Sequence, residues 1–551
     1  MFVCPNCGAN IIFDPGKQLL HCDYCDTDLS PDSLIQKDDA QEQTYTETQP
    51  DDSSETGYSE YTTTVYTCKE CGGEILANDN TVATFCSYCG ASTVLASRIS
   101  KERAPEYIIP FKITKQECGD IYKKHLKKAL YAPGYMKEDV VIDKFRGIYM
   151  PYWVYDFGKN GEISFGAKDD RRSGDYIIHT TYNVTTNVEA SYNGLSYDAS
   201  SQFSDTLSEA IAPFDFSQAV PFNTSYMSGF YADAADADAS IYVDRYKSMV
   251  TGEIYSQITS DKSIRNKRVI NLNSSTFEPD KAQTRMGYFP VWFLSCRHKD
   301  RLTYAVINGQ TGEVAMDVPI DYKKYILSSL IIAAVLFAIL FFIPSSVMRP
   351  GFMLFISVVL ACVSMGIICD KKNKLYAREN NLDDLGLAAK KKNEAASESG
   401  ESSGAVPPVS APSYKSKQGT VPFYYYVIAV LVFVFVCLPF GIAGIGLFVA
   451  VGIPLFNKAK DKAVNKKIIE VENVKVKSPG MDKLVLCLKP LLGIILSILV
   501  WFIAPAADEY YYIAAMVCIA GVLLSFFDIT GLHNKLSTRP LPQFDKRGGD
   551  E

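Results

Sequence analysis

The sequence has few histidines and tryptophans and none of the common catalytic motifs. Five histidines and three tryptophans are spread over 551 residues. No Walker A loop, no His-Glu-x-x-His, no Gly-x-Ser-x-Gly and no Gly-x-Gly-x-x-Gly in a usable context occurs. The scattered histidines offer no catalytic triad. The sequence therefore predicts no catalytic residue and no cofactor-binding residue, and we do not expect an enzyme.

Excess positive charge is also missing. The chain has 55 Lys and Arg against 62 Asp and Glu, a formal net charge of −7. Proteins that bind nucleic acid in bulk usually present a basic face, so no nucleic acid is expected as a partner. The first residues also lack the basic and apolar regions of a secretory signal. A secreted, disulfide-bonded protein is therefore not expected.

Cysteine is plentiful and regularly spaced. Eight of the 15 cysteines form two blocks in which two Cys-x-x-Cys pairs are separated by fourteen residues. Each block also has an aromatic residue two positions before its first cysteine and a glycine after its second. Two such pairs point four thiolates at one ion, and a filled tetrahedron leaves no position for a substrate. We predict two zinc ribbons, each with one structural Zn²⁺, held by Cys4, Cys7, Cys22 and Cys25 and by Cys68, Cys71, Cys86 and Cys89.

Other interpretations of the cysteines are weaker. Each block could hold disulfides or a redox-active Cys-x-x-Cys, but a four-cysteine spacing that occurs twice is a more specific signal for zinc. His21 could compete with Cys22 as a ligand, yet Phe85 takes its place in the second block. The stretch between the blocks is acidic and poor in apolar residues, so it is expected to be a disordered linker. Its charge would also repel phosphates.

The middle of the chain is expected to be a mixed α+β domain. Thr114 and Glu117 match a capping box at the start of a helix that should end before Pro133. The pattern Arg-x-x-Tyr-x-Pro-x-Trp occurs at 146–153 and again at 285–292, which predicts a β pseudo-repeat. Residues 308–312 should form a turn between two strands. The aromatic residues could line a ligand cleft, but aromatic stripes at strand period are more often core.

The last part of the chain contains long uncharged apolar runs. Runs near 325–343, 352–369, 484–504 and 510–529 are each long enough to cross a bilayer. Residues 421–456 are too long for one crossing and have a Pro-Phe-Gly midway, so they are expected to form a hairpin that spans twice or is re-entrant. The basic residues fall in 370–420, 457–483 and 530–551. The positive-inside rule then predicts about six spans in the cell membrane, with both termini in the cytoplasm.

The expected organisation has ten segments. They are zinc ribbon 1 (1–30), an acidic linker (31–63), zinc ribbon 2 (64–100), a cytosolic α+β domain (105–320), a transmembrane hairpin (325–369), a basic low-complexity linker (370–420), a second transmembrane hairpin (421–456), a basic cytosolic loop (457–483), a third transmembrane hairpin (484–529) and a cytosolic tail (530–551).

These features together resemble a known group. The ribbons, the paired Tyr-x-Pro-x-Trp strands and the Asn-Gly-Gln-Thr-Gly-Glu hairpin before the first span are similar to a family of uncharacterised bacterial multi-pass membrane proteins with N-terminal zinc ribbons. The resemblance covers roughly residues 1–345. Members are often labelled after the transcription factor IIB zinc ribbon or the primosomal helicase. The helicase activity does not carry over, because no phosphate-binding loop is present. The cysteine ligands do carry over.

The leading hypothesis is a membrane-anchored scaffold. We expect an integral protein whose zinc ribbons bind a cytosolic or membrane protein partner at the bilayer surface. One alternative is an accessory subunit of a transporter or channel, although the spans contain almost no charge. A second alternative is an enzyme that uses an aromatic-lined cleft in residues 105–320.

Overall fold

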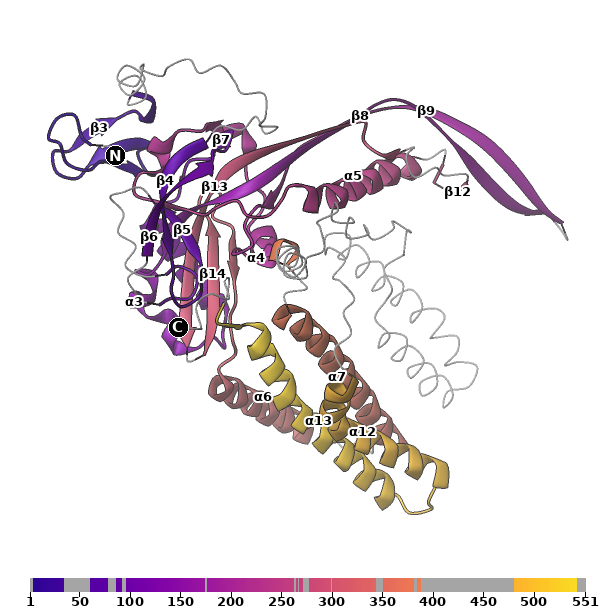
Figure 1. The fold of residues 1–551 in the computed structure, drawn as a ribbon. Coiled ribbons are helices and arrows are strands. Elements are labelled where there is room, and N and C mark those ends of the chain that lie inside the picture. Colours follow the sequence, from indigo (N-terminus) through magenta and orange to yellow (C-terminus); the bar gives the residue numbers. More distant parts are fainter. Residues whose placement is uncertain are drawn as a thin grey trace, which may run out of the picture.

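The computed structural model describes most of the chain outside its longest linkers. The described residues are 3–33, 60–77, 86–91, 96–173, 176–261, 264–265, 267–270, 277–298, 300–342, 350–380, 384–387 and 480–542. They form a small N-terminal sheet, a large mixed sheet domain and a bundle of long apolar helices (Figure 1).

The small sheet is antiparallel and has three strands, β1 (Ile12–Asp14), β2 (Leu19–Cys22) and β3 (Thr27–Leu29). It does not stand apart from the large domain. The amide of Phe13 donates to Ser228 O at 3.0 Å, and the Phe13 ring packs edge-on against Tyr226 at 5.2 Å. The short helix η1 (Pro31–Ser33) continues this interface, because Asn223 Nδ2 donates to the carbonyl oxygen of Pro31.

The large sheet has 13 strands. Neighbouring strands along its main path are, in order, β10-β7-β13-β8-β11-β5-β4-β6. The strands that carry or flank the second cysteine block, β4, β5 and β6, form one end of this order. Five further strands, β9, β12, β14, β15 and β16, lie off the main path. The bounds are β4 Glu60–Thr67, β5 Glu74–Ala77, β6 Ala96–Arg103, β7 Tyr107–Ile108, β8 Arg146–Ser173, β9 Tyr176–Asp198, β10 Val220–Pro221, β11 Tyr231–Ala232, β12 Arg268–Ile270, β13 Lys281–His298, β14 Arg301–Asn308, β15 Val314–Met316 and β16 Arg539–Pro540.

The two copies of the Arg-x-x-Tyr-x-Pro-x-Trp pattern lie on adjacent antiparallel strands. In the β8–β13 ladder Tyr149 pairs with Pro290, and Pro151 pairs with Tyr288. This register relates the copies by a local two-fold axis within one sheet. Their aromatic side chains are buried: Trp153 and Trp292 are each 5% exposed. The aromatic stripe is therefore core packing in the described structure, the interpretation that the strand period favours.

Strands β8 and β9 continue beyond the sheet as a long two-stranded ribbon (Figure 1). Alternate residues of β9 from Val184 to Tyr192 are half-buried, and those between them are exposed. This period of two indicates that one face of the ribbon packs on the domain while the other faces outward. Helix α5 (Ser240–Ser260) contacts both strands.

The helix predicted after Thr114 is present. It is α2 (Lys115–Lys128), with both hydrogen bonds of the capping box formed between Thr114 and Glu117. The buried side chains of α2 include Tyr122 and Leu126, and the helix packs near β15. The predicted turn is also confirmed, since β14 ends at Asn308 and β15 begins at Val314. The remaining short helices are η2 Gly134–Lys137, α3 Asp139–Ile142, α4 Asp205–Ala210, η3 Phe216–Gln218 and η4 Thr224–Met227.

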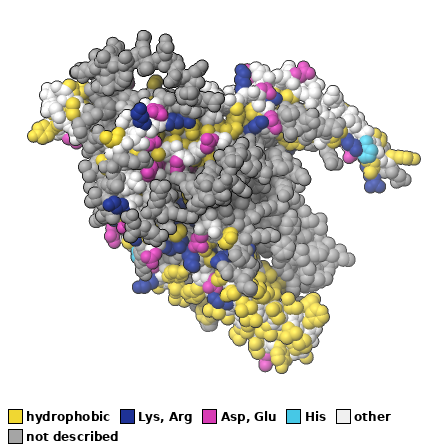
Figure 2. Space-filling model, in the orientation of Figure 1, with side chains coloured by type: hydrophobic (Ala, Val, Ile, Leu, Met, Phe, Trp, Pro, Cys, Tyr) yellow, Lys and Arg dark blue, Asp and Glu magenta, His cyan; other side chains and the backbone are white. Residues whose placement is uncertain are grey.

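Four helices in the described part of the chain are long and apolar enough to cross a membrane. They are α6 (Tyr322–Phe342), α7 (Pro350–Glu379), α12 (Gly480–Ile503) and α13 (Glu509–Leu536). Figure 2 shows hydrophobic side chains gathered over this bundle. The expectation of six spans is not supported: four candidates are described, and the hairpin expected at 421–456 lies outside the described residues.

Small residues allow α12 and α13 to pack closely. A Cβ added at Gly493 would lie 2.5 Å from Cys518 Cα, and one added at Gly521 would lie 2.6 Å from Lys489 O. Close approach through small residues is typical of helices that associate in membranes. Lys489 and Asp528 form an ion pair at 2.7 Å, which lowers the cost of placing either charge in an apolar bundle.

The bundle is attached to the sheet domain at one end. After α13 the chain pairs as β16 with β14, and Arg539 lies 3.5 Å from Asp317. Arg378, near the end of α7, lies 3.9 Å from the same carboxylate. The start of α6 and the ends of α7 and α13 are therefore on the same side of the bundle as the sheet domain.

The expected acidic linker is mostly outside the described residues. At its two ends, residues 31–33 and 60–63 belong to η1 and β4.

Candidate metal centres

Each cysteine pair sits on a tight turn that requires an unusual backbone conformation. The residue after the second cysteine of every pair has a positive φ: 74° at Gly8, 55° at Asp26, 71° at Gly72 and 68° at Gly90. The amide of each of these residues donates to the carbonyl oxygen of the first cysteine of its pair at 2.8–3.0 Å. This closed turn places both thiols on one side. Glycine accepts such a φ without strain, and aspartate is among the few other residues that tolerate it.

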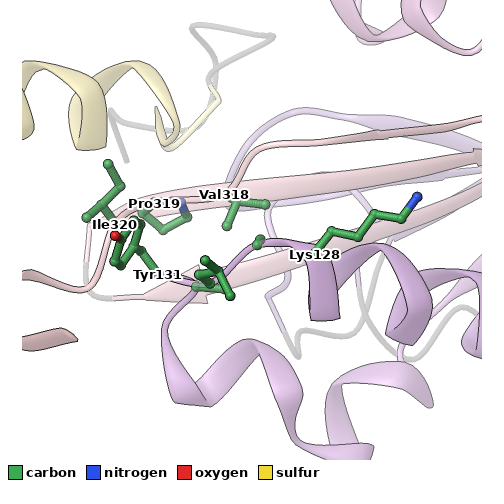
Figure 3. Close-up of a pocket in the computed structure, with 8 residues that line it drawn as sticks. Lys128, Tyr131, Val318, Pro319 and Ile320 are labelled. Carbon is green, nitrogen blue, oxygen red and sulfur yellow. The ribbon is translucent and has the colours of Figure 1, made fainter. Parts of the chain in front are cut away.

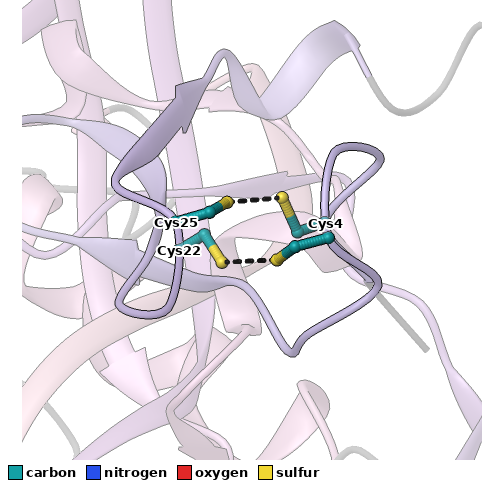
Figure 4. Close-up of side chains that lie close together, drawn as sticks. Cys4, Cys22 and Cys25 are labelled. Carbon is teal, nitrogen blue, oxygen red and sulfur yellow. Dashed lines mark hydrogen bonds between the residues drawn. The ribbon is translucent and has the colours of Figure 1, made fainter.

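The turns bring the thiols of each block together. In the first block Cys4 Sγ lies 3.5 Å from Cys25 Sγ, and Cys7 Sγ lies 3.5 Å from Cys22 Sγ (Figure 4). In the second block the corresponding distances are 3.7 Å for Cys68–Cys89 and 3.7 Å for Cys71–Cys86. All four sulfurs of a block lie within 4.8 Å of one another.

These distances fit a metal ion better than disulfides. A disulfide needs an S–S distance of about 2.05 Å. A tetrahedron of sulfurs at about 2.3 Å from a central Zn²⁺ has edges of about 3.8 Å. The observed separations are close to the second value, and the thiols are free. Each block is therefore a group of four sulfur ligands that could hold one metal ion.

The thiols influence one another's ionisation. In the second block, hydrogen bonds from Cys71, Cys86 and Cys89 hold the pKa of Cys68 well below its usual range. The neighbouring Cys68 in turn raises the pKa of Cys71 well above it. In the first block, the hydrogen bond to Thr27 lowers the pKa of the Cys25 thiol to about 6. Some thiols of each block thus ionise more readily than others, whereas four thiolates together need a cation.

The two centres have different surroundings. The second is enclosed in the sheet domain, where all four cysteines are buried and the Tyr304 hydroxyl donates to Tyr88 O at 2.9 Å. The first lies at the surface, where Cys7 is exposed and Tyr24, between its last two cysteines, is 86% exposed. Identical spacing therefore gives one internal centre and one accessible centre.

The structure brings together all eight cysteines that the sequence singled out, four in each group. His21 lies outside the sulfur group. Its Nδ1 is 2.6 Å from Asp28 Oδ1. The sequence pattern indicated the glycines after Cys7 and Cys71, but Asp26 and Gly90, which have the equivalent role, were not predicted from it. The position after the last cysteine of each block carried that signal, because it repeats the same turn.

The fold and the two sites define this protein as one of a class with three parts. These parts are two groups of four cysteines near the N-terminus, a large mixed sheet domain that encloses the second group, and four candidate membrane helices among the described residues.

A relative from a bacterium matches much of the chain. The uncharacterized protein YdjG of Bacillus subtilis (strain 168) is 29% identical over 336 residues, which cover 59% of this chain and 91% of YdjG. No family model matches the chain, and no solved structure matches it. The relative's name assigns it no activity, so function rests on the geometry.

Proposed function

We propose that this protein is a membrane-anchored, non-enzymatic recognition protein whose first cysteine group presents a binding surface to a protein partner. The observation that carries the proposal is the contrast between the two groups. A centre enclosed in the sheet domain serves the fold, whereas a centre with an exposed aromatic residue between its ligands can also serve contact.

Zinc is the metal we assign to both groups. Four thiolates at tetrahedral spacing are the usual ligand set of a structural zinc site, and a full set leaves no position for substrate. A reducing cytosol would keep these thiols available. Each ion would stabilise its ribbon.

Tyr24 is the centre of the proposed contact surface. It is 86% exposed, and the apolar side chains of Val3 (45% exposed) and Ile12 (40% exposed) lie on the same small ribbon. Large exposed aromatic residues often supply most of the energy of a protein interface. The acidic residues Asp23 and Asp26, which flank the last two cysteines, favour a basic partner surface over phosphates.

The bundle would anchor the chain as a multi-pass protein and hold this surface on the inner side of the cell membrane. The sheet domain, the end of α7 and the strand after α13 share one side of the helices. Basic residues cluster on that side, namely Lys323, Lys324, Lys371, Lys372, Lys374, Arg378, Lys535 and Arg539. The positive-inside rule favours the cytoplasm for that side and for both termini.

The test compares three full-length proteins purified from membranes after cross-linking in cells: wild type, Tyr24→Ala and Tyr176→Ala. Tyr176, at the tip of the β8–β9 ribbon, is 79% exposed and serves as the matched control. We expect a cross-linked partner with wild type and Tyr176→Ala, and its loss with Tyr24→Ala while two zinc ions per chain are retained. A partner retained equally by Tyr24→Ala would contradict the proposal.

A further inference from the structure

The end of α2 lies directly against the start of the first candidate span. The amide of Asp321 donates to Tyr131 O at 2.8 Å, and the Tyr131 ring packs against Tyr325 at 5.1 Å. Lys324 Nζ donates to Ala132 O at 2.6 Å. Since α6 begins at Tyr322, the last turn of α2 is at the level where the span enters its apolar environment.

A small cavity lies at this junction (Figure 3). It has a volume of about 290 Å³ and is lined by residues 128–132 and 318–320. Most of its lining is apolar, including Val318, Pro319 and Ile320. Leu130, at its edge, is 75% exposed. An exposed leucine beside a span is costly in water and favourable against lipid.

Three exposed lysines lie at this junction, and one of them, Lys128, lines the cavity. Lys127 and Lys128 end α2 and are exposed, and Lys323 is exposed in the first turn of α6. Within the described part of the chain, no carboxylate lies within ion-pair distance of any of the three. The nearby Asp321 faces Lys324 instead, at 3.8 Å. The junction therefore combines exposed positive charge with an apolar cavity.

We propose that this junction is a binding site for an anionic phospholipid of the membrane in which the chain is anchored. Lys127, Lys128 and Lys323 would contact the phosphate, and Leu130 with the cavity wall would contact the glycerol and the first acyl carbons. The outer face of α6 favours lipid over a protein: none of its span is buried within the described structure. The apolar surface of α6, the apolar cavity and the exposed lysines therefore occur in the same order as the acyl chains, the glycerol groups and the headgroups of a lipid leaflet.

The test is a titration of the full-length protein in neutral detergent with phosphatidylglycerol or phosphatidylcholine, with bound lipid counted by native mass spectrometry. We compare wild type with Lys127→Gln/Lys128→Gln, the charge-conserving Lys127→Arg/Lys128→Arg, and the charge-matched control Lys101→Gln/Lys281→Gln. Both control lysines are exposed on strands of the sheet domain.

Wild type, the arginine variant and the control should prefer phosphatidylglycerol. The Lys127→Gln/Lys128→Gln variant should bind it about 30-fold more weakly, from about five-fold per lysine near a membrane surface. Leu130→Gln should weaken both lipids alike, because it removes apolar contact and no charge. Equal binding of the two lipids by wild type, or equal loss in both Lys→Gln variants, would overturn the proposal. So would displacement of the lipid by millimolar inorganic phosphate, which would indicate a site for the free anion.

Discussion

At the scale of single residues, eight cysteines with one spacing have two different environments. In the first group Cys7 is exposed, whereas all four cysteines of the second group are buried in the sheet domain. Burial slows access of a chelator, and loss of a ligand inside a core also leaves unpaired polar groups there. The two groups should therefore differ in how easily they lose metal and in what that loss does to the fold.

The first prediction follows from this difference. Replacing Cys22 and Cys25 with serine should reduce zinc from two ions per chain to one and leave the sheet domain folded. Replacing Cys86 and Cys89 should also remove one ion, but it should lower the yield of folded protein or its thermal midpoint. Elemental analysis and thermal unfolding of the purified variants measure both effects. Equal stability of the two variants would contradict the assignment of the second centre to the core.

A second residue-scale feature is a group of buried carboxylates beside α4. Asp198 is fully buried, and among the described residues its carboxylate oxygens have no hydrogen-bond partner within normal distance. The Ser208 hydroxyl donates to Tyr152 Oη at 2.9 Å. Burial, followed by the charges of Asp205 and Asp384, raises the pKa of Asp198 well above its usual range. Burial also raises the pKa of Asp205 to about 6. The groups around them are Tyr152, Tyr197, Glu209, Tyr242, Arg245 and Tyr246.

This gives a prediction for pH. A carboxyl whose folded-state pKa is raised keeps its proton longer in the folded protein, so its stabilising contribution is present at acid pH and is lost as the pH rises through the folded value. Asp198→Asn cannot ionise. The thermal midpoint of Asp198→Asn relative to wild type should therefore increase from pH 5 to pH 8, by the equivalent of about 1.4 kcal/mol for each pH unit of this range that lies below the folded pKa of Asp198.

The control for this prediction is Asp280→Asn. A hydrogen bond from Lys159 lowers the pKa of Asp280, so wild type loses that contribution only as the pH falls below the usual carboxyl range. The difference in thermal midpoint between Asp280→Asn and wild type should stay constant between pH 5 and pH 8. If both variants respond to pH in the same way, the buried carboxylates are not the cause.

At the scale of elements, neighbouring side chains lie so close to the backbone of some strands that only glycine fits there. A Cβ added at Gly287 on β13 would lie 2.3 Å from the ring of Tyr107, whereas one added at Gly158 on β8 would have its nearest neighbour, Lys281 Cβ, at 3.7 Å. Gly287→Ala should therefore destabilise the domain by about 1–3 kcal/mol through overpacking. Gly158→Ala should be neutral or slightly stabilising, because it restricts the unfolded chain. Thermal unfolding of both variants checks the prediction, and a similar loss at both sites would contradict it.

Local signals in the sequence predicted local structure well. The Thr114–Glu117 capping box and the turn at residues 308–312 depend on neighbours in the chain, and both form as expected. The cysteine spacing predicted the sulfur groups for the same reason, since each turn is closed by its own backbone. The pairing of β8 with β13 joins residues more than a hundred positions apart. No local pattern specifies such a register, although the repeated motif hinted at a relation between the two strands.

At the scale of the whole molecule, the sheet domain and the bundle are joined by several separate connections. The chain enters the bundle at α6, returns at the end of α7, where residues 384–387 dock by a hydrogen bond from the Leu385 amide to Asp205 at 2.8 Å, and returns again as β16. From the sequence, residues 370–420 and 530–551 were expected to be a linker and a tail. Because these docked segments are short, they carried no signal that could be separated from the polar residues around them.

These connections lead to a prediction about sidedness. Ala506 lies in the turn between α12 and α13, at the end of the bundle away from the sheet domain, and Lys374 lies on α7 near the attached end. Both are exposed. If the sheet domain is cytoplasmic, a membrane-impermeant thiol reagent should label Ala506→Cys in intact cells. It should label Lys374→Cys only after the membrane is permeabilised. Wild type, which carries only the native cysteines, serves as the background. Labelling of Lys374→Cys from outside intact cells would reverse the orientation that the basic residues indicate, and it would place both cysteine groups outside the reducing compartment that favours zinc over disulfides.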